Sequence, residues 1–80
     1  MWNKKSLKQL RNIPLPYRSA ITDATRKLEE FPECPNVKPL ENHKYGYRLR
    51  VGRYRVLFDY DGQIKIIEIQ EVKKRDERTY

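Results

Sequence analysis

Polar and apolar residues alternate along two neighbouring runs in the second half of the chain, YGYRLRV and YRVLFDY. Such alternation is typical of strands with one buried face. The pair Gly52-Arg53 separates the runs and suits a type II′ turn, because glycine tolerates positive φ. Asp61-Gly62, a strong type I′ signal, follows the second run. The pattern predicts a meander of three antiparallel strands: Tyr45–Val51, Tyr54–Tyr60 and Gln63–Val72.

Two-residue loops fix the register of this meander. The first loop places Arg50 opposite Arg55, and the second places Arg55 opposite Glu68. Side chains alternate across a strand, so one face of the sheet should be apolar and the other should carry Arg48, Arg50 and Arg55. The apolar face is then formed by Leu49, Val51, Tyr54, Val56, Phe58, Ile67 and Ile69.

The facing arginines Arg50 and Arg55 are an unfavourable pair, because like charges directly opposite each other destabilise a sheet. A sequence that keeps such a pair can use it to hold an anion. The alternative is that Arg55 pairs with Glu68 while Arg50 points into solvent. The strand pattern alone leaves both interpretations open.

The first half of the chain predicts two helices. Trp2 to Arg11 forms a short helix capped by Asn3, with an apolar stripe that includes Leu7 and Leu10. A second helix runs from Pro16 to Phe31, with Ala20, Ile21, Ala24, Leu28 and Phe31 on its apolar side. The proline-rich segment from Pro32 to His43 is expected to be a loop. Two helices packed on one face of a three-stranded antiparallel meander give an α+β fold in a single domain, residues 1–80.

Composition narrows the range of partners. The formal charge is +7, and Lys44 to Arg55 contains five basic residues and no acid. This basic segment, with tyrosines between the basic residues, favours a polyanionic partner such as nucleic acid. No apolar run approaches the ~20 residues that a membrane span needs, so no membrane partner is expected. The lone cysteine, Cys34, favours a reducing cytoplasm. One histidine and one cysteine make a metal site improbable, and no cofactor is expected.

The chain resembles the RelE/ParE superfamily of toxins from bacterial and archaeal toxin–antitoxin operons. The resemblance rests on the order of two helices, loop and meander, on the run YGYRLRVGRYRVLFDYDG, and on the ending EVKKRDERTY. RelE-type members cut mRNA in the ribosomal A site, whereas ParE-type members share the fold and poison DNA gyrase. The resemblance implies a cytoplasmic toxin that inhibits translation as a ribosome-dependent mRNA endoribonuclease. It also implies a cognate antitoxin, with which the toxin can form a hetero-oligomer, and the ribosome and mRNA as further partners.

In the RelE-type reaction the ribose 2′-OH attacks the adjacent phosphate. The resemblance places the family's catalytic basic residues on Arg48 and Arg50 before the turn, Arg55 after it and Arg75 in the tail, with Tyr80 as the terminal aromatic. Arg55 and Arg75 would hold the scissile phosphate, because a guanidinium can bind it through two hydrogen bonds. Tyr80 would stack on a base or help to transfer a proton. The remaining basic residues of this segment and of the tail would bind RNA, namely Lys44, Arg53, Lys73, Lys74 and Arg78.

Three features depart from the RelE pattern. RelE carries lysines at the positions of Arg48 and Arg50, and an arginine stays protonated and serves poorly as a general base. The tail lacks the histidine that many relatives carry before the arginine. The first strand is reduced or missing, which would expose a sheet edge. Alternatives are therefore a ParE-like gyrase inhibitor or a catalytically inactive RelE homologue. Candidates for the general base are Lys44, Lys73, Lys74, Glu68 and Tyr80, with His43 a poorer one.

Overall fold

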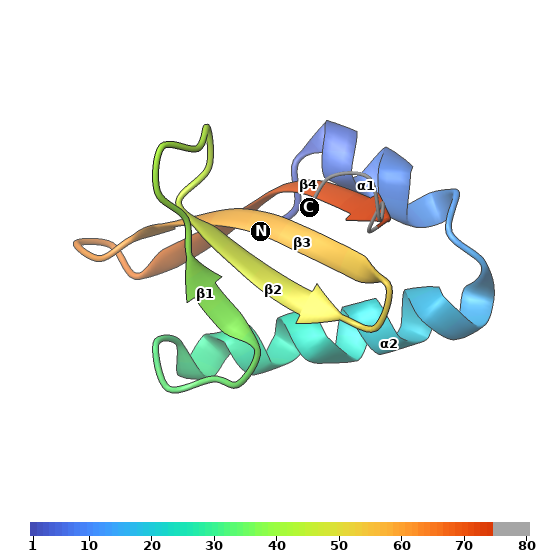
Figure 1. Cartoon of the computed structure of the whole chain (residues 1–80), viewed down its shortest axis with the longest axis horizontal. Helices are drawn as coiled ribbons and strands as arrows, with labels where there is room; N and C mark the ends of the chain where they lie inside the picture. The colour runs from blue at the N-terminus through green and yellow to red at the C-terminus, as the bar shows by residue number, and fades with distance from the viewer. Residues whose placement is uncertain (75–80) are drawn as a thin grey trace.

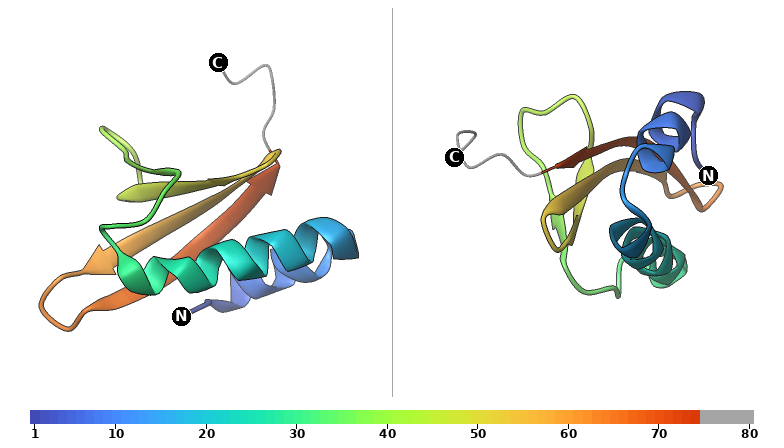
Figure 2. Two further views of the ribbon diagram at one scale, coloured as in Figure 1. Left: turned by 90° about the horizontal axis from the view of Figure 1, so that it is seen from below. Right: turned by 90° about the vertical axis from the view of Figure 1, so that its right-hand side faces the viewer.

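The computed structural model describes residues 1–74, and it consists of a helical layer packed on one face of an antiparallel sheet (Figure 1). Two further views show both helices on the same side of the sheet (Figure 2). This arrangement confirms the predicted α+β class. The elements in chain order are α1 (Lys4–Arg11), α2 (Leu15–Arg26), the 3₁₀ helix η1 (Lys27–Glu30), β1 (Val37–Pro39), β2 (Tyr47–Val51), β3 (Tyr54–Asp61) and β4 (Ile66–Lys74).

Helix α1 begins at Lys4, two residues after the predicted start at Trp2, and Asn3 caps it as predicted. The Asn3 side chain accepts a hydrogen bond from the Ser6 N–H at 2.7 Å, as an N-cap does. Helix α2 begins at Leu15, one residue before the predicted start, so Pro16 lies within its first turn. The last predicted turn of this helix tightens into η1, which ends at Glu30 before Pro32.

The sheet contains four strands in the order β1-β2-β3-β4, one more than the sequence predicts. The additional strand, β1, lies in the segment that was expected to be a loop, and Val37 pairs with Leu49. The prediction was wrong here because three residues that end in a proline carry no alternating pattern. Such a short strand with Lys38 and Pro39 is typical of a sheet edge.

The first hairpin has the predicted register, with Arg50 opposite Arg55 and Val51 opposite Tyr54. The register predicted for the second hairpin is wrong. Its turn comprises residues 62–65 rather than two residues, and the Asp61 carboxylate accepts the Gln63 N–H at 2.9 Å inside it. A β-bulge adds one further residue, Gln70, between the partners of Leu57 and Phe58.

This second register changes the neighbours of the arginines. Arg55 lies opposite Lys73, not Glu68, and Glu68 lies opposite Asp59. Val56 faces Val72 instead of Ile67. The predicted pairing of Arg55 with Glu68 across the strands is therefore wrong.

The core lies between the helices and the predicted apolar face of the sheet. The ring of Phe31 packs edge-on against Phe58, with centroids 5.8 Å apart, and against Tyr47 at 4.9 Å. Two residues predicted on the apolar stripes of the helices, Leu7 and Ala20, are exposed, and Ser6, which the stripes do not include, is buried. The cluster of buried residues comprises Ile13, Ile21, Leu28, Leu49, Val56, Phe58, Ile69 and Val72.

The N-terminal segment pairs with β4 and reduces the exposure of its edge. Trp2 forms a parallel bridge with Ile69, whose N–H donates to the Met1 carbonyl at 2.6 Å. Side chains of α1 continue this capping: the Ser6 hydroxyl donates to the Ile69 carbonyl, and Gln9 Oε1 accepts the Val72 N–H at 2.7 Å. The first strand is thus reduced to a short bridge, and polar side chains satisfy the backbone groups that it leaves.

Candidate functional site

Four basic residues lie on the sheet face that points away from the helices. We call this set, Arg48, Arg50, Arg55 and Lys73, the cationic row. The register places Arg50, Arg55 and Lys73 directly opposite one another across β2, β3 and β4. Their neighbours along the strands, Leu49, Val56 and Val72, are buried on the other face. Alternation along each strand thus brings these cations to one face.

Arg55 lies between positive neighbours. Burial of its guanidinium lowers the pKa of Arg55, and the positive charges of Arg48 and Arg50 lower it further. Both causes disfavour the charged form of Arg55, so an anion bound beside it would be stabilised. Across the strand, Lys73 has its own acidic neighbour, with its Nζ 3.6 Å from Glu71 Oε1.

Arg48 carries a buried hydrogen-bond donor. Its Nε atom is inaccessible to solvent and has no hydrogen-bond partner among residues 1–74. Arg48 faces Leu57 on β3, which is itself buried. Arg48 as a whole is half-buried. A buried donor without a partner costs about 1–3 kcal/mol, so an acceptor that reached this Nε atom would stabilise the folded chain.

Of the other predicted site residues, Lys44, Arg53 and Lys74 lie on segments next to those of the row, and Lys74 lies opposite Tyr54, on the other face from Lys73. Lys44 lies before β2, with its Nζ 5.5 Å from the centre of the Tyr45 ring, within cation–π range. Arg53 is exposed in the first turn, beside Gly52 with φ 56°, and Lys74 is exposed at the end of β4. The predicted residues Arg75, Arg78 and Tyr80 lie outside the described residues.

Two side chains near the site were missed by the sequence analysis. Tyr45 is buried, and its backbone N–H donates to His43 Nδ1 at 3.0 Å. The Asp59 carboxylate accepts the Gly46 N–H at 2.7 Å. The contact of Asp59 has no sequence signal, because it depends on the fold that brings the loop before β2 to β3, whereas the contact of Tyr45 is local to the loop. In the part of the chain that the structure describes, no cluster of His, Cys, Asp or Glu could hold a metal ion.

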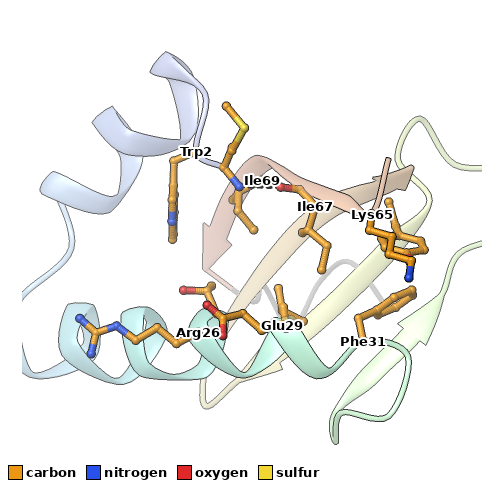
Figure 3. Close-up of a pocket in the computed structure, with 11 residues that line it drawn as sticks. Trp2, Arg26, Glu29, Phe31, Lys65, Ile67 and Ile69 are labelled. Carbon is orange, nitrogen blue, oxygen red and sulfur yellow. Dashed lines mark hydrogen bonds between the residues drawn. The ribbon is translucent and has the colours of Figure 1, made fainter. Parts of the chain in front are cut away.

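A separate hollow lies on the helical side of the sheet. This cavity of about 330 Å³ opens between the N-terminal segment, α2 and β4 (Figure 3). Trp2, Phe31, Ile67 and Ile69 supply much of its apolar wall, while Arg26, Glu29 and Lys65 add charged groups. Because the core separates it from the cationic row, this hollow is not part of the candidate site.

A family model for the ParE toxin of the type II toxin–antitoxin system parDE matches residues 1–79. The chain belongs to this toxin family. It is thus a RelE/ParE-type toxin, as the sequence predicts. No curated protein sequence matches the chain at a significant level. In the part of this toxin that the structure describes, no helix has the length and apolar character that crossing a membrane requires.

Solved RelE-type structures share the fold of this toxin. The chain matches the toxin–antitoxin complex RelBE2 from Mycobacterium tuberculosis with a TM-score of 0.80 and 22% identity, covering 94% of each chain. The archaeal RelE–RelB complex from Pyrococcus horikoshii gives a TM-score of 0.75 and 27% identity, with 95% of this chain and 92% of that chain covered. The RelB–RelE complex from Methanococcus jannaschii gives 0.73 and 20%, covering 92% and 88%. The family model is of ParE type and the similar structures are of RelE type, so these matches identify a toxin without fixing its target.

The cationic row of this toxin predicts an anion effect on stability. Sulfate should raise the melting temperature of the wild type more than chloride at equal ionic strength, because it relieves repulsion between Arg50 and Arg55. Arg50→Ala should raise stability in chloride by roughly 0.2–1 kcal/mol and reduce the additional gain from sulfate. Thermal melts of both proteins in the two salts measure this. Sulfate stabilises proteins in general, so an equal gain in both would contradict anion binding at the row.

Proposed function

We propose that this toxin is a ribosome-dependent mRNA endoribonuclease that inhibits translation. The observation that carries the proposal is the cationic row, in which Arg50, Arg55 and Lys73 face one another across three strands. Repulsion within the row is unfavourable for folding alone, and a phosphodiester would offset it. An exposed cationic face of this kind suits RNA better than it suits a protein surface.

The row could stabilise the charge that develops during cleavage. The ribose 2′-oxygen would form a bond to the adjacent phosphorus while the bond from phosphorus to the 5′-oxygen breaks, leaving a 2′,3′-cyclic phosphate and a 5′-hydroxyl. Arg55, beside Arg48 and Arg50, would bind the phosphate oxygens as their negative charge grows. Arg75 and Tyr80 remain proposed participants from the tail, in phosphate binding and in base stacking or proton transfer.

The reaction also requires a group that accepts the 2′-hydroxyl proton and one that protonates the 5′-oxygen. The strand register distinguishes two candidates for proton transfer, Lys73 and Glu68. Lys73 lies directly opposite Arg55, whereas Glu68 lies opposite Asp59, several residues along the same strand. Lys73 is thus better placed than Glu68 to reach a phosphate held by Arg55. Arginines 48 and 50 would serve as electrostatic groups, since a guanidinium does not lose its proton at accessible pH.

Partners follow from the same proposal. The similar solved structures are complexes of a toxin with its antitoxin, which supports a cognate antitoxin for this chain. An antitoxin that neutralises the toxin would bring acidic or apolar residues to the cationic row. Translating ribosomes would supply the mRNA, and Lys44, Arg53, Lys74 and Arg78 would contact its backbone outside the scissile phosphate.

The competing function is inhibition of DNA gyrase, and the ParE-type family model favours it. Induced expression in growing bacteria, followed by primer-extension mapping of a defined transcript, tests both functions. New 5′ ends within translated frames, absent when translation is blocked, are the expected result. Growth arrest without such ends, together with loss of supercoiling activity by purified gyrase, would support the ParE-like function instead. A folded toxin that causes neither arrest nor cleavage would be an inactive homologue.

A further inference from the structure

A chain of side-chain hydrogen bonds crosses the sheet from the cap of α1 to the loop before β2. Asn3 Oδ1 accepts the Ser6 N–H at 2.7 Å, which leaves its Nδ2 group to donate to Gln70 Oε1 at 3.0 Å. Gln70 then has only its Nε2 group for the next contact, and this donates to Asp59 Oδ2 at 3.2 Å. The helix cap therefore fixes the orientation of both amides.

The Asp59 carboxylate links these hydrogen bonds to the loop before β2. Its second oxygen, Oδ1, accepts the Gly46 N–H at 2.7 Å, so each carboxylate oxygen faces a donor. An asparagine has only one acceptor oxygen and would set its NH₂ group against the donor of either Gly46 or Gln70. The network thus demands a carboxylate at position 59.

The absence of a side chain at Gly46 allows this close contact with Asp59. A Cβ atom at position 46 would lie 3.3 Å from Asp59 Oδ1, closer than such contacts usually are. The Gly46 carbonyl in turn accepts the Leu40 N–H at 2.9 Å, which closes the loop of residues 40–46 at its base. This loop rises on the side of the sheet opposite α2 (Figure 2). The strand register places the cationic row on the same side.

We propose that Asp59 is a positioning residue that holds the segment Lys44–Gly46 in place, so that Lys44 extends the cationic row for binding RNA. Asp59 alternates with Arg55 and Leu57 along β3, so its carboxylate points to the same face as the row. Lys44 is exposed and lies two residues before Gly46, on the chain that leads into Arg48 and Arg50. Part of this inference rests on the proposed function, because it assigns Lys44 to RNA.

Amide hydrogen exchange in the purified toxin tests the structural part of the proposal, that Asp59 holds the segment around Gly46. Asp59→Asn should speed the exchange of the Gly46 amide by about tenfold, because its acceptor is lost or opposed by an NH₂ group. Gly46→Ala should disturb the same contact from the other side, and exchange in the segment around position 46 should rise in that variant as well. Asp23→Asn, which changes an exposed carboxylate on α2, is the matched control and should leave the exchange unchanged. The Val56 amide reports whether each variant remains folded.

A double-mutant cycle tests the functional half with a short single-stranded RNA as the probe. Lys44→Ala should weaken binding roughly 3- to 10-fold in the wild-type background and much less in the Asp59→Asn background. An equal loss in both backgrounds would show that Asp59 does not position Lys44, and unchanged Gly46 exchange would overturn the hydrogen-bonded link itself. A wild type that binds no RNA would refute the RNA role of Lys44 and weigh against the proposed function, while the exchange data would still decide whether Asp59 holds the loop.

Discussion

Replacing Arg55 with alanine should lower the rate of mRNA cleavage by about 10²–10³-fold and leave the fold intact. Arg55 lies between Arg50 and Lys73 in the sheet, and the charges of Arg48 and Arg50 act on its guanidinium, which would meet the charge that develops on the phosphate. Its removal also reduces repulsion within the row, so the melting temperature should not fall greatly. Single-turnover cleavage of ribosome-bound mRNA, with a thermal melt of the same preparation, measures both effects.

Two further variants sharpen this experiment. Arg26→Ala removes an exposed arginine on α2, on the other side of the core, and should cleave at the wild-type rate. Arg55→Lys keeps the charge and loses the planar fork, so its rate should lie between those of the wild type and Arg55→Ala. Cleavage by Arg55→Ala at the wild-type rate would remove Arg55 from the catalytic set. An unfolded Arg55→Ala would instead mean that this side chain stabilises the sheet more than it serves RNA.

The first hairpin and its face of arginines could be predicted because local signals determine them. Gly52 at positive φ permits a tight turn, and that turn fixes Arg50 opposite Arg55. The alternating residues on both sides then assign each side chain to a face. Contacts between distant parts of the chain contribute little to this register, so the local sequence is sufficient to predict it.

The second hairpin shows why pattern alone can fail. Lengthening the turn from two residues to four shifts the partners by an even number of residues, so the apolar side chains stay on the same face. The alternation of Ile67 and Ile69 is therefore compatible with either turn, and only the observed pairing distinguishes them. The bulge at Gln70 moves the partners once more. Together, the longer turn and the bulge replace Glu68 by Lys73 opposite Arg55 and change the chemistry expected at the site.

The polar contacts between α1 and the edge of the sheet could not be predicted from hydrophobic periodicity either. Ser6 is buried because its hydroxyl donates to the Ile69 carbonyl, a partner 63 residues away along the chain. Gln9 and Asn3 act in the same way on Val72 and Gln70. A hydrophobic pattern selects Leu7 for this helix face and gives no sign of a serine, because the requirement comes from unpaired backbone groups on β4.

Phe58→Ala should destabilise the toxin by about 3–5 kcal/mol, the largest stability effect that we expect from a single substitution. Phe58 is fully buried, stacks on Tyr47 with centroids 5.5 Å apart, and receives the edge of Phe31. Its removal would leave a cavity between the helical layer and the centre of the sheet, where neighbouring rings have little freedom to collapse. Urea unfolding followed by tryptophan fluorescence of Trp2 measures the loss.

The same variant separates folding from chemistry in the cell. A domain of this size has a total stability of roughly 4–12 kcal/mol, so Phe58→Ala removes much of it and should abolish growth arrest through loss of folded toxin. Arg55→Ala should abolish arrest while its unfolding curve stays close to that of the wild type. Ile64→Ala, at a side chain that is 63% exposed in the second hairpin, should change stability by no more than about 0.5 kcal/mol. If Phe58→Ala unfolds at the same urea concentration as Ile64→Ala, the ring of Phe58 does not contribute to the core as its burial indicates.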